Sequence, residues 1–478
     1  MVEGYIEKTK RKKILLLSDD LRMHSGVATM SREIVVGTAH KYNWFQLGAA
    51  LKHPEIGKVI DISDDINKTV SIPDSDVKVM PFEGYGNAMI IRQLLKREKP
   101  DAIFIFTDPR YWTWLFEIER EIRSQVPICW LNIWDDYPAP MYNRNYYNSV
   151  DCLMGISKQT VNINKLVLGD DAKDKVINYV PHGINQNHFF PITHEHELYP
   201  KLVEFKKQTI PNQDIEFLAY FNSRNIHRKR PGDVILSFKL FCDSIGEKAA
   251  KKVGLILHTE ASNPHGTDLR AVKEAIYPEG NIYFSTAKIN TPQMNFMYNM
   301  ADVTMLITSN EGWGLSLTES IMAGTMVIPN VTGGMQDQCR FVDGKGKWID
   351  FDSDFPSNHR GTYKECGVWA EPVYPSNISL AGSPGTPYIY DDRCDPNDVA
   401  AALNFVYGLP KDVRDQNGKI GREWVTSKEA QMTASQMCNN IVKSIDETLI
   451  NFKPRKRFEV FKADKPQSKK VTHALTGY

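Results

Sequence analysis

The sequence lacks a run of about 18 apolar residues, which is the length that a helix needs to cross the hydrocarbon core of a bilayer. Its seven cysteines are scattered and include no C-x-x-C pair, so disulfide and metal sites are weak interpretations and reduced thiols are the better one. The N-terminus is polar and lacks the apolar core and the small-residue cleavage site of a secretory signal. These absences predict a cytoplasmic protein without a transmembrane segment, in the host cytoplasm if the chain is viral.

A net charge is also absent, because 58 Lys and Arg residues balance 58 Asp and Glu residues. The chain therefore has no overall field that attracts nucleic acid or a membrane, and such a partner would need a local patch. The clearest local excess is the tail at 452–478, where eight basic residues stand against two acidic ones. A tail of this composition is also typical of a disordered segment.

The sequence does have enough length for two large domains, since 478 residues exceed a single ordinary core. Short, nearly all-apolar runs alternate with helical patterns, as in parallel sheets that are covered on both faces. These runs lie at 13–18, 101–106, 127–133, 151–156, 215–221, 252–258, 303–308 and 326–329. The alternation predicts two Rossmann-like, doubly wound α/β domains that face an interdomain cleft, lined by loops at the carboxyl ends of the strands.

The predicted domain limits follow from where the strand–helix pattern breaks. We expect a first domain at 1–190 and a second domain at 191–425. A helix at 426–451 is expected to return to the first domain, and the basic tail at 452–478 ends the chain. Within the second domain, residues 345–396 are rich in Gly, Pro, Ser and aromatic residues and predict an irregular excursion.

The most informative stretch is S-N-E-G-W-G-L-S-L-T-E, which begins at Ser309. A strand that ends at Thr308 is followed by a glycine-bearing loop and by a helix that opens near Leu315, so free N–H groups of the helix N-terminus lie beside the strand end. That geometry suits a diphosphate, and Gly312 and Gly314 allow a bulky anion to approach the backbone. The candidate ligand-binding residues here are Glu311, Gly312, Trp313, Gly314, Leu315 and Glu319.

Charged side chains in two segments fit the same ligand. Glu319 lies about a turn into the helix and can accept hydrogen bonds from ribose hydroxyls, whereas Glu311 on the loop can face a sugar. Upstream, F-N-S-R-N-I-H-R-K-R-P follows the strand that ends at Phe221 and places Arg224 and Lys229 five residues apart. A fork-shaped arginine and a point-charge lysine can together neutralise a diphosphate leaving group without a metal ion.

The two segments together resemble the E-x7-E element and the Arg/Lys pair of retaining GT-B glycosyltransferases. This is glycosyltransferase family four, which includes sucrose synthases and many α-mannosyl- and α-glucosyltransferases. The resemblance implies that Glu311 lies near the donor sugar, that Glu319 binds the ribose, and that Arg224 and Lys229 bind the donor phosphates. It also implies a UDP- or GDP-sugar donor, retention at the anomeric carbon, front-face attack, and no metal ion or other cofactor.

Weaker matches extend the resemblance towards the N-terminus and the domain junction. The segment H-S-G-V-A-T-M-S, which begins at His24, matches the family's N-terminal glycine loop, in which Gly26 approaches the donor phosphate. The segment V-P-H-G-I-N contains His182, which is either part of the interdomain site or a structural histidine. The T-G-G sequence at 332–334 fits a loop on the donor side.

One departure from the family pattern concerns the reaction centre. Many members have a histidine after an N-terminal-domain strand, near the sugar, but the corresponding stretches here are I-F-T-D-P-R-Y-W and N-I-W-D-D-Y. Asp108 and either Asp135 or Asp136 occupy these positions, where they either accept a sugar hydroxyl or an acceptor proton, or cap the helices that follow. Asp135 is the candidate catalytic residue, and the identity of the donor sugar stays open.

The resemblance implies sugar transfer to a hydroxyl acceptor, which is a glycan, a lipid-linked glycan or a small metabolite. An alternative acceptor is a hydroxylated base in viral DNA, because the basic tail and several aromatic residues suit a nucleic acid. Those aromatic residues are Trp112, Trp114, Trp134 and Tyr137. A further alternative is a non-catalytic binding module. Such a module would be expected to lack one of the charged motif residues, yet all four are present, namely Arg224, Lys229, Glu311 and Glu319. The oligomeric state is not predicted.

Overall fold

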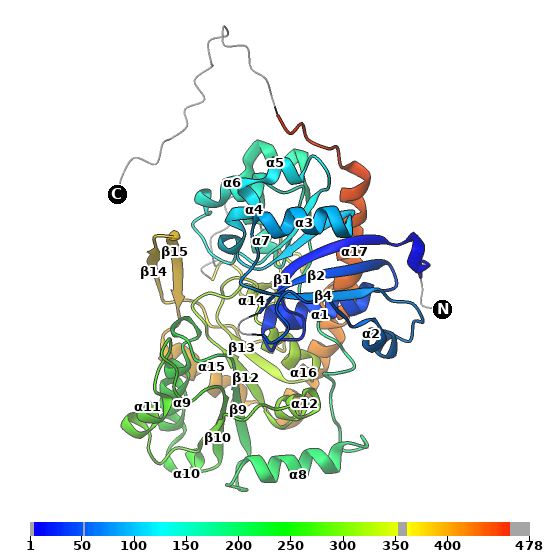
Figure 1. Ribbon diagram of the computed structural model, residues 1–478. Coiled ribbons are helices and arrows are strands. Elements are labelled where there is room, and N and C mark those ends of the chain that lie inside the picture. The colour runs from blue at the N-terminus through cyan, green and yellow to red at the C-terminus, as the bar shows by residue number, and fades with distance from the viewer. Residues whose placement is uncertain (1–3, 51–52, 352–360, 459–478) are drawn as a thin grey trace.

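The computed structural model describes residues 4–50, 53–351 and 361–458. Two α/β halves lie one above the other, each built on its own sheet (Figure 1). Among the described residues, the first sheet has the strand order β3-β4-β2-β1-β5-β6-β7-β8, and every pairing is parallel except that of β3 with β4. Its strands are β1 (Lys12–Asp19), β2 (Tyr42–Ala50), β3 (Ile60–Asp61), β4 (Val77–Glu83), β5 (Ala102–Phe106), β6 (Ile128–Asn132), β7 (Cys152–Gly155) and β8 (Val176–Tyr179).

Helices cover both faces of this sheet. They are α1 (Gly26–Thr38), α2 (Ser63–Val70), α3 (Ala88–Glu98), α4 (Thr113–Glu117), α5 (Glu119–Ile122), α6 (Arg144–Asn148) and α7 (Lys158–Leu168). Because successive side chains of a strand point to opposite faces, Ile14 and Leu16 of β1 pack in the core layer that holds α1, whereas Leu15 and Leu17 pack in the layer that holds α3. Burial on both faces explains why β1 is a nearly continuous apolar run.

The second sheet is wholly parallel, in the order β11-β10-β9-β12-β13. Its strands are β9 (Phe217–Asn222), β10 (Val253–His258), β11 (Ile282–Ser285), β12 (Val303–Leu306) and β13 (Met326–Pro329). The helices that follow in this half are α8 (Tyr199–Thr209), α9 (Pro231–Ile245), α10 (Glu247–Ala250), α11 (Leu269–Ile276), α12 (Thr291–Met300), α13 (Leu315–Met322), α14 (Met335–Cys339), α15 (Pro396–Gly408) and α16 (Lys411–Val425). The two predicted doubly wound sheets are therefore confirmed.

The last helix, α17 (Ala434–Asn451), packs on α1 of the first half. The Tyr42 hydroxyl of β2 donates a hydrogen bond to the Asp446 carboxylate of α17 (2.7 Å). The chain runs between the halves in two adjacent segments, since Ile184 exchanges backbone hydrogen bonds of 3.0 Å with Met432 and Ala434. Within the described residues, no helix is long and apolar enough to span a membrane.

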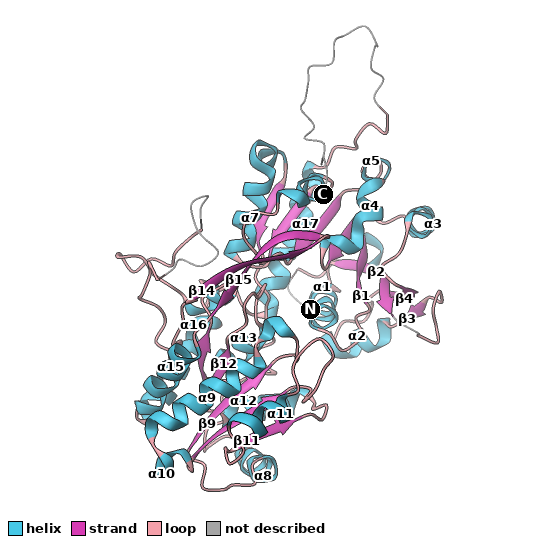
Figure 2. Ribbon diagram, turned by 90° about the vertical axis from the view of Figure 1, so that its left-hand side faces the viewer, coloured by secondary structure: helices cyan, strands magenta, loops and turns pink. Residues whose placement is uncertain are grey.

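The region at 345–396 differs from the irregular excursion that the sequence predicts. Its described part contains an antiparallel hairpin of β14 (Asn377–Ser383) and β15 (Thr386–Arg393), whose turn holds Pro384 and Gly385. The hairpin projects from the C-terminal half towards the N-terminal half (Figures 1 and 2). Residues 352–360 of the same region lie outside the described residues.

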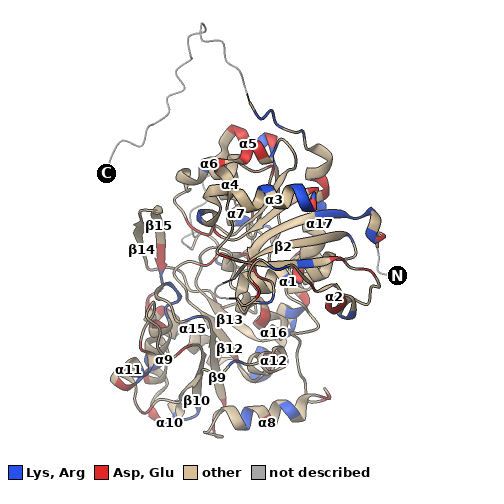
Figure 3. Cartoon of the chain, viewed as in Figure 1, with Lys and Arg blue, Asp and Glu red and all other residues tan. Residues whose placement is uncertain are grey.

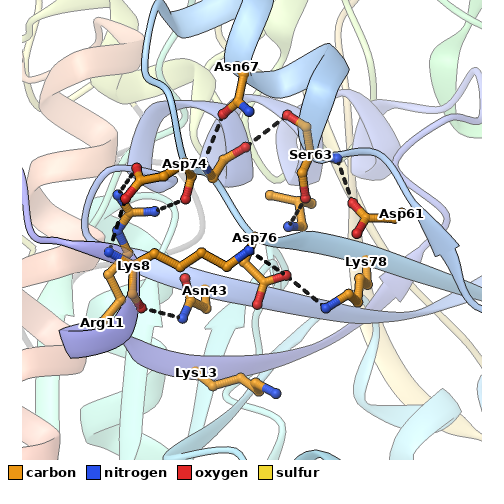
Figure 4. Close-up of polar contacts among 12 residues, drawn as sticks. Lys8, Arg11, Lys13, Asn43, Asp61, Ser63, Asn67, Asp74, Asp76 and Lys78 are labelled. Carbon is orange, nitrogen blue, oxygen red and sulfur yellow. Dashed lines mark hydrogen bonds and ion pairs between the residues drawn. The ribbon is translucent and has the colours of Figure 1, made fainter.

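A polar network ties together the amino ends of β1 and β4 (Figure 4). The Arg11 guanidinium, whose side chain is 0% exposed, contacts the Asp74 carboxylate at 2.6 Å and donates a hydrogen bond to the Asp74 carbonyl oxygen at 2.8 Å. Lys78 and Lys8 both contact the Asp76 carboxylate, at 2.9 and 3.7 Å. Because parallel strands share their amino edge, this network lies at the edge of the sheet opposite the carboxyl ends.

Candidate active site

The carboxyl ends of both sheets open onto one cavity of about 1010 Å³ between the two halves. Loops after β1, β5 and β6 line it from the N-terminal half, and loops after β9, β10, β11 and β12 line it from the C-terminal half. All ten candidate site residues from the sequence line this cavity: Gly26, Asp135, Arg224, Lys229, Glu311, Gly312, Trp313, Gly314, Leu315 and Glu319. The fold therefore brings together residues that are almost 300 positions apart in the chain.

The loop between β12 and α13 presents backbone to the cavity. Gly314, the residue before α13, has a φ of 87°, a left-handed conformation that favours glycine. A Cβ atom on Gly334 would collide with the carbonyl oxygen of Gly312, and the Gly334 N–H donates to the Glu311 carbonyl oxygen (3.0 Å). The segment at 332–334 thus lies directly behind the Glu311 loop and fixes its shape. The N–H groups of Leu315 and Ser316 at the start of α13 have no partner among the described residues and are available to an anion.

The side chain of Trp313 has a different environment from the backbone of its loop. It is only 2% exposed, and its indole N–H donates to the Thr318 hydroxyl (2.9 Å). The Gln338 amide donates to the Trp313 carbonyl oxygen (2.5 Å). Trp313 therefore anchors the loop to the core and also lines the cavity.

Basic side chains converge on this loop from the segment after β9. Lys229 forms a direct ion pair with the Glu311 carboxylate, and the Arg228 guanidinium lies 3.8 Å from the same carboxylate. Arg228 also donates to the Asn310 carbonyl oxygen (2.7 Å). Arg224 is exposed at the cavity wall, and its guanidinium has no hydrogen bond or ion pair with any described residue, so this group is free to bind an anion.

Glu319 lies on α13 in a mostly apolar and aromatic environment. The Tyr298 hydroxyl donates to its carboxylate (2.5 Å), and the Asn222 amide donates to the Tyr298 hydroxyl (2.9 Å). Burial raises the pKa of Glu319 to about 7, although the hydrogen bond from Tyr298 acts in the opposite direction. One carboxylate oxygen is thereby oriented, and the group can accept hydrogen bonds from ligand hydroxyls when it is ionised.

The loop after β6 carries Asp135 and Asp136, and helix α7 holds it in place. The Gln159 amide donates to the Asp135 carbonyl oxygen (2.6 Å), and the Thr160 hydroxyl donates to the Trp134 carbonyl oxygen (2.8 Å). Burial raises the pKa of Asp136, and the neighbouring Asp135 carboxylate raises it further. Neither aspartate is the N-cap of a described helix, and both line the cavity, where their side chains interact with each other.

Asp108 fits the capping alternative. It accepts a hydrogen bond from the Arg110 N–H at 2.9 Å and caps the short 3₁₀ helix Pro109–Trp112. Its carboxylate also forms an ion pair with the Arg110 guanidinium at 2.6 Å. Asp108 borders the cavity, but its oxygens are already engaged.

Gly26 and His182 complete the wall on the N-terminal side. A Cβ atom on Gly26 would lie 3.6 Å from the Leu315 side chain, so the start of α1 and the start of α13 meet across the cavity. His182 is 6% exposed and packs edge-on against Phe106 and Trp313. Burial lowers its pKa to about 3, which keeps the ring neutral and supports the structural interpretation of this histidine.

Several cavity residues were not predicted from the sequence. They include Asn222, Thr259 and the segment at 285–288 after β11. The Thr259 hydroxyl is buried and has no hydrogen-bond partner among the described residues, which leaves it available to a ligand. The sequence feature that indicates the segment at 285–288 is the short run N-I-Y-F-S. This run contains β11, and the residues that follow it lie at the carboxyl edge of the sheet.

No protein-family model and no curated protein sequence matches the chain. Solved structures match over nearly its whole length. A glycosyltransferase from Rickettsia africae has a TM-score of 0.61 at 12% identity, with 92% of this chain and 99% of that chain covered. HepE from Anabaena in complex with UDP and glucose has a TM-score of 0.62 at 10% identity, with 91% and 100% covered. Sucrose-phosphate synthase from Thermosynechococcus elongatus has a TM-score of 0.63 at 14% identity, with 92% and 100% covered.

At such low identities the likeness concerns the fold. Each matched chain is covered almost completely, so the similarity includes both α/β halves and their relative placement. The chain therefore has the GT-B fold, with two Rossmann-like domains that face an interdomain cleft.

Proposed function

We propose that the protein is a retaining glycosyltransferase that transfers a sugar from a UDP- or GDP-sugar to a hydroxyl acceptor. The observation that carries this proposal is the convergence of Arg224, Lys229, Glu319 and the N-terminus of α13 on one cavity. This set offers cations for a diphosphate and a carboxylate for a ribose. The fold match adds support, since HepE is in complex with UDP and glucose and, in another structure, with UDP-glucose.

In the proposed reaction the diphosphate is the leaving group. Arg224, Lys229 and the free N–H groups of α13 stabilise the negative charge that grows on it in the transition state. Glu311 lies near the donor sugar, and its ion pair with Lys229 holds both groups at the reacting end of the donor. Because these groups neutralise the diphosphate themselves, the proposed step uses no metal ion.

The acceptor hydroxyl attacks from the N-terminal side of the cleft. Asp135 is proposed to accept a hydrogen bond from this hydroxyl and to orient it. No side chain is assigned as a covalent nucleophile. The departing phosphate takes the acceptor proton on the same face of the sugar, so the anomeric configuration is retained. We place the limit between acceptor-side and donor-side domains near residue 191, between β8 and α8.

Modification of DNA is the second candidate, and the charge distribution favours it less. Lys and Arg are mixed with Asp and Glu over both halves (Figure 3). The described start of the basic tail packs on the N-terminal half, where the Arg455 N–H donates to the Arg123 carbonyl oxygen (2.8 Å). Arg123 pairs with Asp151 at the amino edge of the sheet, away from the cleft. Transfer to a duplex that falls steeply with salt would instead favour DNA.

Ligand binding to the full chain tests the proposal. We expect the thermal unfolding temperature to rise with one nucleotide diphosphate and with a matching nucleotide sugar in the presence of EDTA. Glu319→Ala should weaken this stabilisation, whereas Glu274→Ala on the exposed face of α11 should not. A protein that no UDP- or GDP-sugar stabilises, or equal stabilisation of both variants, would show that the donor site is assigned wrongly.

A further inference from the structure

The β14–β15 hairpin is attached firmly to the donor side of the cleft. The Asp392 N–H of β15 donates to the Ser309 carbonyl oxygen (2.9 Å), and the Asn330 amide donates to the Asp392 carbonyl oxygen (2.9 Å). The preceding Asp391 forms an ion pair with Arg230 (2.8 Å). The base of the hairpin is thus bonded directly to the segment that leads to Glu311.

The other end of β15 lies on the N-terminal half. The Tyr390 N–H donates to the Tyr137 carbonyl oxygen (2.7 Å), and the Tyr142 hydroxyl donates to the Tyr388 carbonyl oxygen (3.0 Å). The rings of Tyr142 and Tyr388 also pack edge to face, with 4.9 Å between their centroids. The hairpin therefore spans the two halves and holds the segment after β6, which carries Asp135.

The hairpin also borders the cavity. Thr386 and Ile389 line it, and a Cβ atom on Gly385 would lie 3.6 Å from the Arg110 side chain. The hairpin thus adds a wall to the N-terminal half of the cleft. This wall is uncharged where it faces the cavity, since its lining residues are a threonine and an isoleucine.

The charges on the two sides of the cavity differ in sign. Four aspartates and one arginine line the cavity from the N-terminal half, namely Asp19, Asp108, Asp135, Asp136 and Arg110. Arg110 is already paired with Asp108. On the opposite side four basic side chains line the cavity, namely Arg224, Arg228, Lys229 and Lys288, together with three glutamates, Glu260, Glu311 and Glu319. The N-terminal side therefore has a clear excess of acidic groups, which disfavours a ligand with phosphate groups, whereas the C-terminal side has a small excess of basic groups.

The N-terminal side also offers partners for hydroxyl groups. Carboxylate oxygens accept hydrogen bonds from hydroxyls, and Trp134 and Ile389 present apolar surface beside them. His182, which is more than nine-tenths buried, lines the same cavity, and its Nδ1 has no hydrogen-bond partner among the described residues. Such a mixture of carboxylates and apolar surface suits a molecule that is rich in hydroxyls and carries no charge.

We propose that the β14–β15 hairpin forms the outer wall of the acceptor subsite, and that this subsite takes an uncharged carbohydrate. The inference rests on the proposed glycosyl transfer. Thr386 and Ile389 contact the acceptor, and the bonds of β15 to Tyr137 and Tyr142 keep Asp135 oriented towards it. The hairpin is thus a specificity-determining element of the acceptor side, and its cavity-lining residues Thr386 and Ile389 do not contribute to donor binding.

Matched acceptors test the chemical class. The full chain and its donor are incubated with neutral mono- and disaccharides, with the phosphate esters of the same sugars, and with a duplex that bears hydroxymethylcytosine. We expect kcat/KM for at least one neutral sugar to exceed that for its phosphate ester by tenfold or more. Preference for the phosphate ester or for the duplex would overturn the inference, and so would donor cleavage without transfer to any neutral sugar.

Hairpin variants test the wall. Thr386→Ala/Ile389→Ala should raise KM for the neutral acceptor at least tenfold and leave nucleotide binding within twofold. Tyr142→Phe, which removes one hydrogen bond and no packing, should lower transfer more than donor hydrolysis. Leu380→Ala, at an exposed site of β14 (66% exposed), is the matched control and should change neither the acceptor KM nor nucleotide binding.

The outcomes separate this inference from the proposed function. Equal acceptor KM values for wild type and for the double variant would overturn the hairpin's role, while donor cleavage would still stand. A parallel loss of nucleotide affinity in the hairpin variants would also overturn it. A wild-type chain that neither binds nor cleaves any nucleotide sugar would instead overturn the proposed glycosyl transfer itself.

Discussion

Among single residues, the two motif glutamates have different partners and so are expected to behave differently. Glu311 is paired with Lys229, whereas the Glu319 carboxylate accepts a hydrogen bond from the Tyr298 hydroxyl and has no ion pair with a described residue. Burial raises the pKa of Glu319 to about 7. The ability of Glu319 to accept ribose hydroxyls therefore depends on pH near neutrality.

We predict that donor affinity falls as the pH is lowered through 7. If only ionised Glu319 binds the ribose well, affinity for the nucleotide sugar falls about tenfold between pH 8 and pH 6. Calorimetric titration of wild type and Glu319→Gln measures this directly, and the variant should bind weakly at both pH values. A wild-type affinity that does not change with pH would contradict the role of Glu319.

The same raised pKa has a consequence for stability. The folded chain binds the Glu319 proton more tightly than the unfolded chain, whose glutamate titrates near 4.5. The contribution of Glu319 to the free energy of unfolding is therefore greatest below pH 4.5 and is lost as the pH rises from 4.5 to 7. Glu319→Gln should remove this part of the pH dependence.

Lys229 is predicted to act mainly on turnover. Lys229→Ala should lower kcat for donor cleavage about 100-fold, because a preorganised cation at the leaving group stabilises the transition state more than the ground state. Steady-state kinetics at saturating donor measures the effect. Lys251→Ala, at an exposed lysine remote from the cleft, is the control and should leave kcat unchanged. A change in KM alone would mean that Lys229 only binds the donor.

Among the structural elements, the loop at 332–334 supports the donor loop. Gly334→Ala places a methyl group against the Gly312 carbonyl oxygen, so backbone must shift, at an expected cost of about 1–3 kcal/mol in the free energy of unfolding. Nucleotide affinity should fall as well, since the displaced segment carries Glu311. Gly344→Ala is the control, because a Cβ atom there meets nothing within 4 Å. Unchanged binding by Gly334→Ala would show that the loop does not depend on this contact.

The network at the amino edge of the first sheet should affect stability only. Asp74→Ala leaves the buried Arg11 guanidinium without its carboxylate and should lower the free energy of unfolding by about 3 kcal/mol. Donor affinity should stay within twofold, because the network is at the edge opposite the cleft. Asp243→Ala, at an exposed i,i+4 pair, is the control for denaturant unfolding. Loss of donor affinity without loss of stability would contradict this separation.

The same elements show what the sequence could predict. Strands with both faces buried, such as β1 and β5, were found because they are uniformly apolar. β2 contains Asn43 and Gln46, and β8 is the short run V-I-N-Y, so neither has a clear apolar or alternating pattern. The hairpin at 377–393 was missed because most of its side chains are partly exposed, so its strands lack a buried face. Its fixed position comes from contacts with Tyr137 and Tyr142, which no local pattern records.

The candidate site was easier to predict than its acceptor side. Glycines and charges at fixed spacings after strands predicted the donor loop, and parallel strands then place such loops at one edge. From the sequence, Asp108 and Asp135 have the same two alternatives, which are to bind a substrate group or to cap the helix that follows. The structure distinguishes them, because Asp108 caps a 3₁₀ helix whereas Asp135 caps none of the described helices. Whether these residues act in catalysis stays a prediction.

In the whole molecule, the two sheets face each other with their carboxyl edges, and the N-terminal half supplies mostly acidic groups to the cavity whereas the C-terminal half supplies both basic and acidic groups. Under the proposed function, basic groups of the C-terminal side bind the diphosphate and the acidic N-terminal side binds an uncharged acceptor. The two adjacent chain segments at Ile184 and Met432 are the covalent links between the halves, and the hairpin is an additional non-covalent link. Under the proposed function, groups from both halves take part in transfer, and the C-terminal half binds the donor.

The central claim is that this cleft cleaves a nucleotide sugar through Arg224 and Lys229. Its most direct test is nucleotide-diphosphate release from a panel of UDP- and GDP-sugars in EDTA, with wild type beside the Arg224→Ala/Lys229→Ala double variant. We predict that wild type slowly hydrolyses one donor, and that the double variant releases at least about 100-fold less from it. No release by wild type from any donor, with or without Mg²⁺, or equal release by the double variant, would contradict the account.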